Sequence, residues 1–481
     1  MKTLEELEST WPNDSLQRTG EGRYLIKYLN ALYGGETDET LYGSFVLNLN
    51  APWGYGKTFF LDNLKLDLME LNHPVVYFDA WGNDYTNTPL LSFISEIQSS
   101  LKPYVDKTPN GKRLLKSFNE KGKKIIGAVA GIGTSILAKK LTGYSLAELK
   151  GIVGIDENDI ATMGDKISEK SENIIGKIVQ KSLDEHQQLK QLILDFKTNL
   201  EDLMVALNED SNFKFPMYIL VDELDRCRPD FAVELLENIK HIFNSKGVFF
   251  IVATNKEQLV NSIKAIYGNQ FDSFSYLKRF FNQEYNLSLP DTMGFSEALF
   301  KKYRISNEKL FFPIEPALNP ARNVLAYMFS QMSSLFGLGL RDKEQICIQL
   351  KSILLTCGDE KLHYPFLIYI LIIKHNHREG DIEKLAKAEV SKLDSAHLVI
   401  SDKSDFGEPR PSITVSYLQL INFYMKLTGL TNKKINQMNI ERHNSYESQV
   451  VSLLLQSSRN GIPFTDLSEY YSLVEKAGHF G

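Results

Sequence analysis

The chain has few cysteines for its length, three in 481 residues, at positions 227, 347 and 357. Their spacing matches no metal-binding pattern, and they offer no plausible disulfide framework of the kind that secreted proteins use. The acidic N-terminal segment also lacks the apolar core of a secretory signal. This cysteine usage is typical of the reducing cytosol, and we therefore expect a cytoplasmic protein.

Long hydrophobic runs are missing as well, since no segment reaches the roughly 18–20 apolar residues that a membrane-spanning helix needs. The nearest is the glycine-rich run IIGAVAGIGTSILA at 125–138, which has lysines on both sides. These basic flanks leave contact with a membrane surface as an alternative, but we favour a buried or partner-facing segment. Positive charge is not in excess either: the formal net charge is −6, which gives no general reason to expect a nucleic-acid partner.

What the sequence does contain is an alternation of strand and helix patterns. Nearly continuous apolar runs predict buried parallel strands at 44–50, 74–81, 217–223 and 247–255. Helical patterns lie between or after these runs, at 57–71, 89–101, 229–244 and 256–267. Such βαβ units build a parallel sheet with helices on both faces, so we predict an α/β fold.

The stretch 102–210 interrupts this alternation with a lysine-rich segment, the glycine-rich run and a long amphipathic helical pattern. We interpret it as a helical insertion into a sheet domain that consists of 1–101 and 211–290. Beyond this domain helical patterns dominate, and the linker SDKSDFGEPRPS at 401–412 is rich in residues that break both periods. We expect a helical domain at 291–400 and a C-terminal helical region at 401–481.

The segment LNLNAPWGYGKTFFLDNL at 47–64 joins the first strand to the first helical pattern through a glycine-spaced turn. In a phosphate-binding loop, backbone N–H groups surround the β-phosphate, and the following helix directs its positive end at the same anion. Gly54 and Gly56 would permit the close approach of backbone to oxygen. Lys57 would reach the β- and γ-phosphates, and Thr58 would offer its hydroxyl to Mg²⁺. The alternative is a plain strand–turn–helix connection.

One position departs from the pattern G-x-x-x-x-G-K-[ST], because Ala51 stands where the pattern has glycine. Alanine costs little at this position if its φ is negative, whereas a positive φ introduces strain of about 1 kcal/mol or more. A penalty of this size lowers the affinity of the loop at most, and does not abolish it.

A second signal is MYILVDELDR at 217–226, an apolar strand that ends in Asp222 and Glu223. A magnesium ion on the β- and γ-phosphates needs an anionic partner, which is the role expected of Asp222, and Glu223 is suited to orient and deprotonate water. A third, weaker signal is VATN, in which Thr254 or Asn255 could sense the γ-phosphate or hold the attacking water. For both strands the alternative is a polar residue that merely caps the strand end.

These blocks resemble the KAP P-loop NTPases, a family of the additional-strand class that also includes STAND and AAA+ proteins. APWGYGKTFFLDNL resembles the Walker A motif of the family, VVYFDAW its characteristic strand, and ILVDELDRCRPDFAVELLENIKHIF its extended Walker B motif. The resemblance covers roughly residues 12–355 and implies ATP and Mg²⁺ as ligands. Two departures are Asp79, where asparagine is usual, and Glu223, where many members have a second aspartate.

The resemblance also implies site residues. The implied nucleotide-binding positions are Asp14, Arg18, Ala51, Pro52, Trp53, Gly54, Tyr55, Gly56, Lys57, Thr58, Phe59 and Asn255. The implied metal ligands are Thr58 and Asp222, and the implied catalytic residues are Glu223, Lys57, Arg279 and Arg341.

The choice between the two catalytic arginines stays open at this point. An arginine on the transferring phosphoryl group raises the rate by about 10³–10⁵. Arg279, in FSYLKRFFNQEYNLSLP, could act across a subunit contact, whereas Arg341, in the lid-like motif GLGLRDKEQI, could act within the chain. We expect Arg226 instead to pair with Asp225 or a neighbouring backbone group as a structural brace.

The function that this resemblance implies is a Mg²⁺-dependent, ATP-hydrolysing molecular switch, with 291–400 as a lid-like domain. It further implies a component of a bacterial or phage anti-phage defence or mobile-element system, which works with a protein partner or as a homo-oligomer. One alternative is a nucleotide-gated scaffold with slow or no turnover that recruits an effector. The other is an NTPase associated with a membrane surface.

Overall fold

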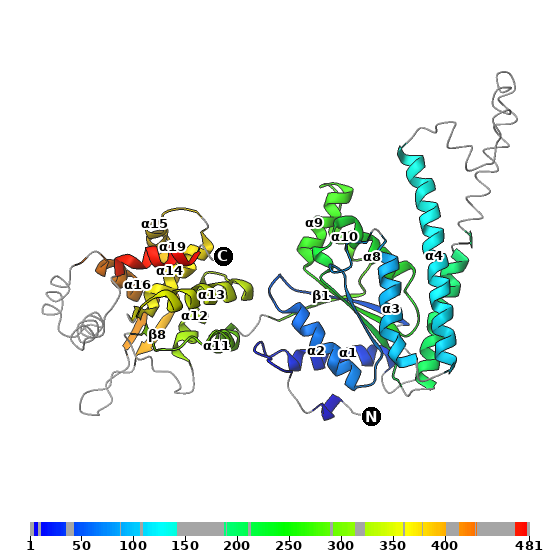
Figure 1. Ribbon diagram of the computed structural model, residues 1–481, viewed down its shortest axis with the longest axis horizontal. Helices are drawn as coiled ribbons and strands as arrows, with labels where there is room; N and C mark the ends of the chain where they lie inside the picture. Colours follow the sequence, from blue (N-terminus) through cyan, green and yellow to red (C-terminus); the bar gives the residue numbers. More distant parts are fainter. Residues whose placement is uncertain are drawn as a thin grey trace, which may run out of the picture. The chain divides into compact units, whose positions relative to one another are not determined.

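The structure is a computed structural model in which the chain forms two compact units (Figure 1). Met1–Trp11 and Arg18–Ser288 form the first unit, and Pro12–Gln17 and Leu289–Gly481 form the second. The residues that the structure describes are 4–7, 11–34, 43–86, 88–105, 109–141, 187–188, 190–209, 213–288, 292–312, 323–358, 361–377, 379–400, 413–428, 430 and 467–478.

The first unit is built on a parallel five-stranded sheet with the strand order β2-β3-β4-β1-β5. The strands are β1 (Ser44–Asn50), β2 (Val75–Asp79), β3 (Met217–Asp222), β4 (Val248–Thr254) and β5 (Gln283–Asn286). The α/β prediction is confirmed, and the four predicted strands are present with ends shifted by two residues at most. The sequence did not predict β5, because its QEYN segment is polar and partly exposed at the edge of the sheet.

Helices cover both faces of this sheet, as the βαβ pattern predicts (Figure 1). The helices of the first unit include η1 (Leu4–Glu6), α1 (Thr19–Gly34), α2 (Lys57–Glu70), α3 (Pro89–Val105), α4 (Pro109–Leu141), η2 (Leu224–Arg226), α8 (Pro229–His241), α9 (Lys256–Tyr267) and α10 (Ser273–Leu277). Because strand side chains alternate, Phe45 and Leu47 of β1 share one core with α1 and α2, whereas Val46 belongs to the core of α3, α8 and α9.

The insertion packs on the second of these cores through α4 and a helical segment at 190–209. The rings of Phe118 and Phe196 lie 4.6 Å apart, and Leu200, Leu203 and Leu207 are fully buried. The amphipathic helical pattern predicted within 102–210 is therefore a packing face, and its first apolar residue, Leu189, lies outside the described residues. The glycine-rich run continues α4, and within the described residues no helix is both long enough and apolar enough to cross a membrane.

The second unit is mostly helical, as predicted. Its helices are α11 (Thr292–Lys302), α12 (Val324–Leu335), α13 (Leu340–Thr356), α14 (Tyr364–Asn376), α15 (Ile382–Glu389), η3 (Val390–Leu393), α16 (Tyr417–Leu427), η4 (Leu467–Glu469) and α19 (Tyr470–Gly478). Two short sheets accompany them, β6 (Leu310–Phe311) with β7 (Leu362–His363) and β8 (His397–Ile400) with β9 (Ile413–Ser416). The apolar run 366–373 is part of α14 and is buried on all sides, which is why it shows no helical periodicity.

The predicted domain bounds stay predictions. The linker at 401–412, on which the division of the helical half rests, lies outside the described residues.

Candidate nucleotide-binding site

The glycine-spaced turn lies between the end of β1 and the start of α2. Gly54 and Gly56 have φ values of +81° and +79°, a region that glycine adopts without strain. Gly56 is the N-cap of α2, and no side chain caps this helix. Thr58 is exposed in its first turn. The turn thus offers unblocked amides at a helix N-terminus, which is the arrangement that binds phosphate.

Ala51 precedes this turn in a normal backbone conformation. It is 2% exposed, and it is not among the described non-glycine residues with positive φ. Its N–H donates to the Thr254 carbonyl over 3.1 Å, which extends the ladder between β1 and β4. The negative-φ alternative therefore holds, and alanine adds little strain to the loop.

Lys57 lies inside the curl of the turn and is only 9% exposed. Its Nζ donates to the carbonyl oxygens of Ala51 over 2.7 Å and of Pro52 over 3.3 Å. Burial lowers the pKa of Lys57, and the carboxylates of Asp225 and Asp222 oppose this shift. The lysine therefore lies within electrostatic range of acids that follow β3, a strand separated from β1 by β4.

Asp222 ends β3 and is 1% exposed. Its two carboxylate oxygens accept hydrogen bonds from the Glu223 N–H over 2.8 Å and from the Tyr77 hydroxyl over 3.0 Å. The pKa of Asp62, on α2, is raised by burial and next by the charge of Asp222, so acids of two elements face one another. These two hydrogen bonds fix the orientation of the Asp222 carboxylate at the carboxyl ends of the strands, where the glycine-spaced turn also lies.

The side chains of Thr58 and Asp222 suit Mg²⁺, because hydroxyl and carboxylate groups are the hard oxygen donors that this ion prefers. Among the described residues no group of three or more histidine, cysteine or acidic side chains could hold a metal by itself. A magnesium ion here would therefore depend on phosphate oxygens and waters for its remaining ligands, as is usual for phosphate-bound Mg²⁺.

Glu223 follows Asp222 in the left-handed backbone region, with φ +56°. Its Oε1 lies 2.6 Å from NH1 of Arg226. Burial raises the pKa of Glu223, whereas the Arg226 charge lowers it. The prediction that Arg226 pairs with Asp225 or a backbone group was wrong about the partner, because the turn of η2 returns the arginine towards Glu223 instead.

Asp225 contacts the glycine-spaced turn directly. It is 7% exposed, and its Oδ2 accepts a hydrogen bond from Nε1 of Trp53 over 2.5 Å. This contact ties the loop after β1 to the turn after β3. Asp225 was not among the predicted site residues, although the Leu-Asp-Arg sequence at 224–226, which contains it, directly follows the acidic pair.

Arg18 supports the turn from the protein interior. It is 1% exposed, forms an ion pair with Glu21 over 2.5 Å, and donates to the Tyr55 carbonyl over 3.4 Å. Because Arg18 is buried and contacts the turn through the Tyr55 carbonyl, its position is that of a residue that supports the turn structurally. The ring of Phe59 packs on Trp11 at 6.2 Å, on the side of α2 that faces the core. Asp14 belongs to the second unit, and its position relative to the turn is not described.

The side chains that end β4 are engaged within the fold. The Asn255 side chain accepts from the Glu257 N–H over 3.2 Å and caps α9. Thr254 is fully buried and donates to Asn48 over 2.7 Å. These contacts are those of strand-end and helix-cap residues, so the geometry favours the structural alternative for this third signal.

The two candidate arginines belong to different units. Arg279 is exposed in the turn after α10, in the first unit. Arg341 is exposed in the first turn of α13, in the second unit. Because the placement of the units relative to one another is not determined, the choice between them stays open.

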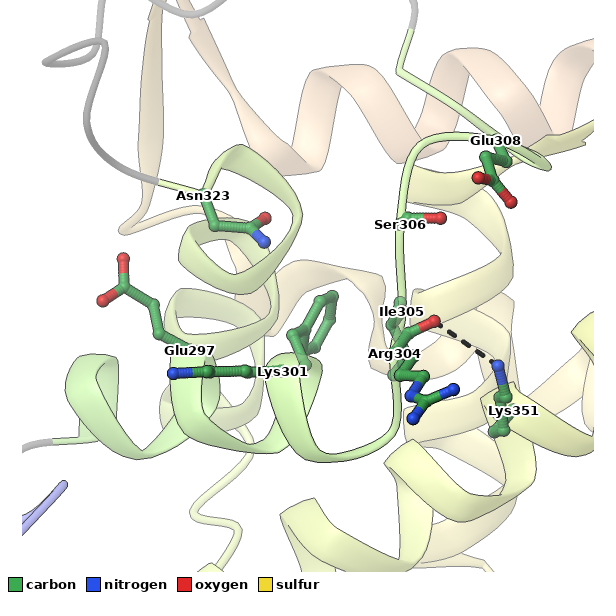
Figure 2. A pocket seen from close by; sticks show the side chains of 9 residues that line it. Glu297, Lys301, Arg304, Ile305, Ser306, Glu308, Asn323 and Lys351 are labelled. Atoms are coloured by element: carbon green, nitrogen blue, oxygen red, sulfur yellow. Dashed lines mark hydrogen bonds between the residues drawn. The ribbon is translucent and has the colours of Figure 1, made fainter. Parts of the chain in front are cut away.

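The second unit contains a cavity of about 650 Å³ (Figure 2). Its lining residues are Glu297, Phe300, Lys301, Arg304, Ile305, Ser306, Glu308, Asn323 and Lys351. Lys351 donates to the Arg304 carbonyl over 3.4 Å, the contact drawn in Figure 2. Charges of both signs line the cavity, since Glu297 and Glu308 accompany the cations. None of the predicted site residues lies there, and it lacks a glycine-spaced turn.

The fold and the site together define a P-loop NTPase of the additional-strand class, because β4 lies between the strand that leads to Lys57 and the strand that ends in Asp222. Residues 27–310, more than half of the chain, match the KAP family P-loop domain. The chain therefore belongs to the KAP family of P-loop NTPases.

Other comparisons add little. A solved structure, described as "Structure of C. elegans PCH-2", is 12% identical over 77% of this chain and 70% of that chain, with a TM-score of 0.28. At this TM-score the likeness supports no functional conclusion. No curated protein matches the chain in sequence.

Proposed function

We propose that this chain is a Mg²⁺-dependent ATPase that works as a molecular switch. The observation that carries the proposal is that the turn bearing Lys57 contacts the turn after β3 through Trp53 and Asp225, so that Lys57 lies within electrostatic range of Asp222 and Glu223. Parallel strands deliver these residues from distant parts of the chain, and the pKa of Lys57 responds to both Asp222 and Asp225. Membership of the KAP family independently supports nucleotide binding.

In this proposal each residue has a separate task. The loop amides and Lys57 bind the β- and γ-phosphates, while Thr58 and Asp222 hold Mg²⁺. When bound, Mg²⁺ neutralises charge on the phosphate oxygens. Glu223 accepts a proton from the water that attacks the γ-phosphorus. Arg279 or Arg341 supplies positive charge to the transferring group.

The test is phosphate release and nucleotide binding by the wild type, Lys57→Ala and Glu223→Gln. We expect Lys57→Ala to lose binding and turnover together. Glu223→Gln should keep binding while kcat falls about 10²–10⁴-fold, the usual contribution of a general base. Mg·ATP at about 100 times its Kd should raise the free energy of unfolding by roughly 2.7 kcal/mol. An unchanged melting curve would contradict nucleotide binding.

Wild type that binds ATP tightly without releasing phosphate would favour the nucleotide-gated scaffold instead of the ATPase. The proposed setting, an anti-phage defence or mobile-element system with a separate effector or a second copy of the chain, rests on family analogy alone. Co-purification from native cells and plaque counts with wild type and Lys57→Ala test it. Equal plaque counts would contradict the defence role while leaving the ATPase proposal intact.

A further inference from the structure

The Arg226 side chain connects Glu223 to the segment that follows β2. Its NH1 lies 2.6 Å from Oε1 of Glu223, and its Cζ lies 5.6 Å from the centroid of the Trp81 ring. The Glu223 side chain is 19% exposed and that of Arg226 is 36% exposed. The guanidinium therefore has a carboxylate on one side and an aromatic face on the other, and both hold it in place.

The segment that carries Trp81 is itself anchored. The Gly82 N–H donates to Oδ1 of Asp79 over 2.8 Å, which fixes the start of the segment to the end of β2. Further along, Arg228 donates from its N–H and Nε to the Asp84 carboxylate, over 2.8 and 3.0 Å, and from NH2 to the Asp84 and Thr86 carbonyls. Trp81 therefore lies in a turn that hydrogen bonds hold at both ends, to Asp79 at the start and to Arg228 at the end.

The backbone of Glu223 is held in one conformation by hydrogen bonds to its neighbours in sequence. Its φ of +56° is a left-handed conformation that costs a non-glycine residue about 1 kcal/mol. Its N–H donates to Asp222 over 2.8 Å, and its carbonyl accepts from the Arg226 N–H over 3.1 Å. This tight turn returns Arg226 over the Glu223 side chain and binds Oε1, whereas Oε2 forms no ion pair within the described part of the chain.

We propose that Arg226 is a positioning residue for the hydrolysis proposed above: it binds Oε1 of Glu223 so that Oε2 is directed at the attacking water. In the step itself, the water oxygen forms a bond to the γ-phosphorus and gives a proton to Oε2. The bond from the γ-phosphorus to the β,γ-bridging oxygen breaks, and its electron pair stays on the departing ADP. Arg226 takes no part in these bond changes, and Trp81 holds Arg226.

The test compares Arg226→Ala, Arg226→Lys and Trp81→Leu with Arg113→Ala, a matched arginine that donates from NH2 to Oδ1 of Asn110 over 3.1 Å on the surface of α4. We expect Arg226→Ala to lower kcat at least about tenfold while KM for ATP changes less than about twofold, because only the geometry of the base is lost. Arg226→Lys, which keeps the charge, should recover part of kcat, and Trp81→Leu should lower kcat less than Arg226→Ala does. Arg113→Ala should match the wild type.

A double variant separates positioning from a merely structural role. In the Glu223→Gln background, adding Arg226→Ala should cause no further fall in kcat, since both changes act through the same carboxylate. Wild-type kcat in Arg226→Ala, or losses that multiply in the double variant, would overturn the inference. If the wild type itself releases no phosphate, the proposed function fails, which is a different result from active wild type with unaffected Arg226→Ala.

Discussion

Replacing Ala51 with glycine, the residue of the general motif, should weaken the fold without improving the site. Ala51 is 2% exposed and has no positive φ to relieve. The change removes one buried methyl group, about 0.8 kcal/mol, and gives the unfolded chain more backbone freedom, about 0.4–1 kcal/mol. We expect a loss of about 1.5 kcal/mol in the free energy of unfolding, which for a unit of this size lowers Tm by about 2–3 °C.

Differential scanning calorimetry of Ala51→Gly measures this loss, and a titration with Mg·ATP measures nucleotide affinity, which should stay within about twofold of wild type. Gly54→Ala is the matched opposite change, because φ of +81° makes alanine strained by about 1 kcal/mol or more. It should weaken nucleotide binding. The reasoning is refuted if Ala51→Gly raises Tm or binds ATP several-fold more tightly, since either result requires strain at Ala51.

Two further predictions concern stability. Burial lowers the pKa of His73 from 6.5 to about 4, so its neutral form contributes stability that is full above pH 6.5 and is lost as pH falls towards 4. We expect His73 to lower the free energy of unfolding by about 2 kcal/mol between pH 7 and pH 5, as measured by urea unfolding. A His73→Gln variant with the same dependence of stability on pH as wild type would contradict this. Trp53→Phe removes the hydrogen bond from Nε1 to the largely buried Asp225 and should lower the free energy of unfolding by about 1–2 kcal/mol. An unchanged urea midpoint would show that this contact between the turn after β1 and the turn after β3 adds no stability.

The strands and helices of the sheet domain were readable from the chain because local pattern determines them. Runs such as 217–221 and 248–253 are apolar throughout since both faces of a central parallel strand are buried. The edge strand β5 could not be predicted in this way, because it is partly exposed and polar and therefore forms no apolar run. The placement of the motifs at strand ends followed from these patterns.

The contacts between motifs were not readable from the chain. The bond from Trp53 to Asp225 joins residues far apart in sequence, and only the packing of β1, β4 and β3 brings their loops together. Arg226 was expected to pair with Asp225 or a neighbouring backbone group, whereas its partner is Glu223, three residues earlier in the chain. The left-handed backbone of Glu223 decided the partner, and sequence spacing does not reveal such a conformation.

The sequence by itself determined the class of fold, the phosphate-binding turn and the acidic strand end, because each depends on residues within about one strand and one helix of one another. Tertiary structure alone decided that Ala51 is unstrained, that Asn255 caps α9, and that Arg226 binds Glu223. The first depends on a backbone angle, and the other two depend on backbone conformations that bring a partner two or three residues away in sequence within reach. Such choices are set by packing across the sheet, where many weak local preferences are overruled by burial and hydrogen bonding.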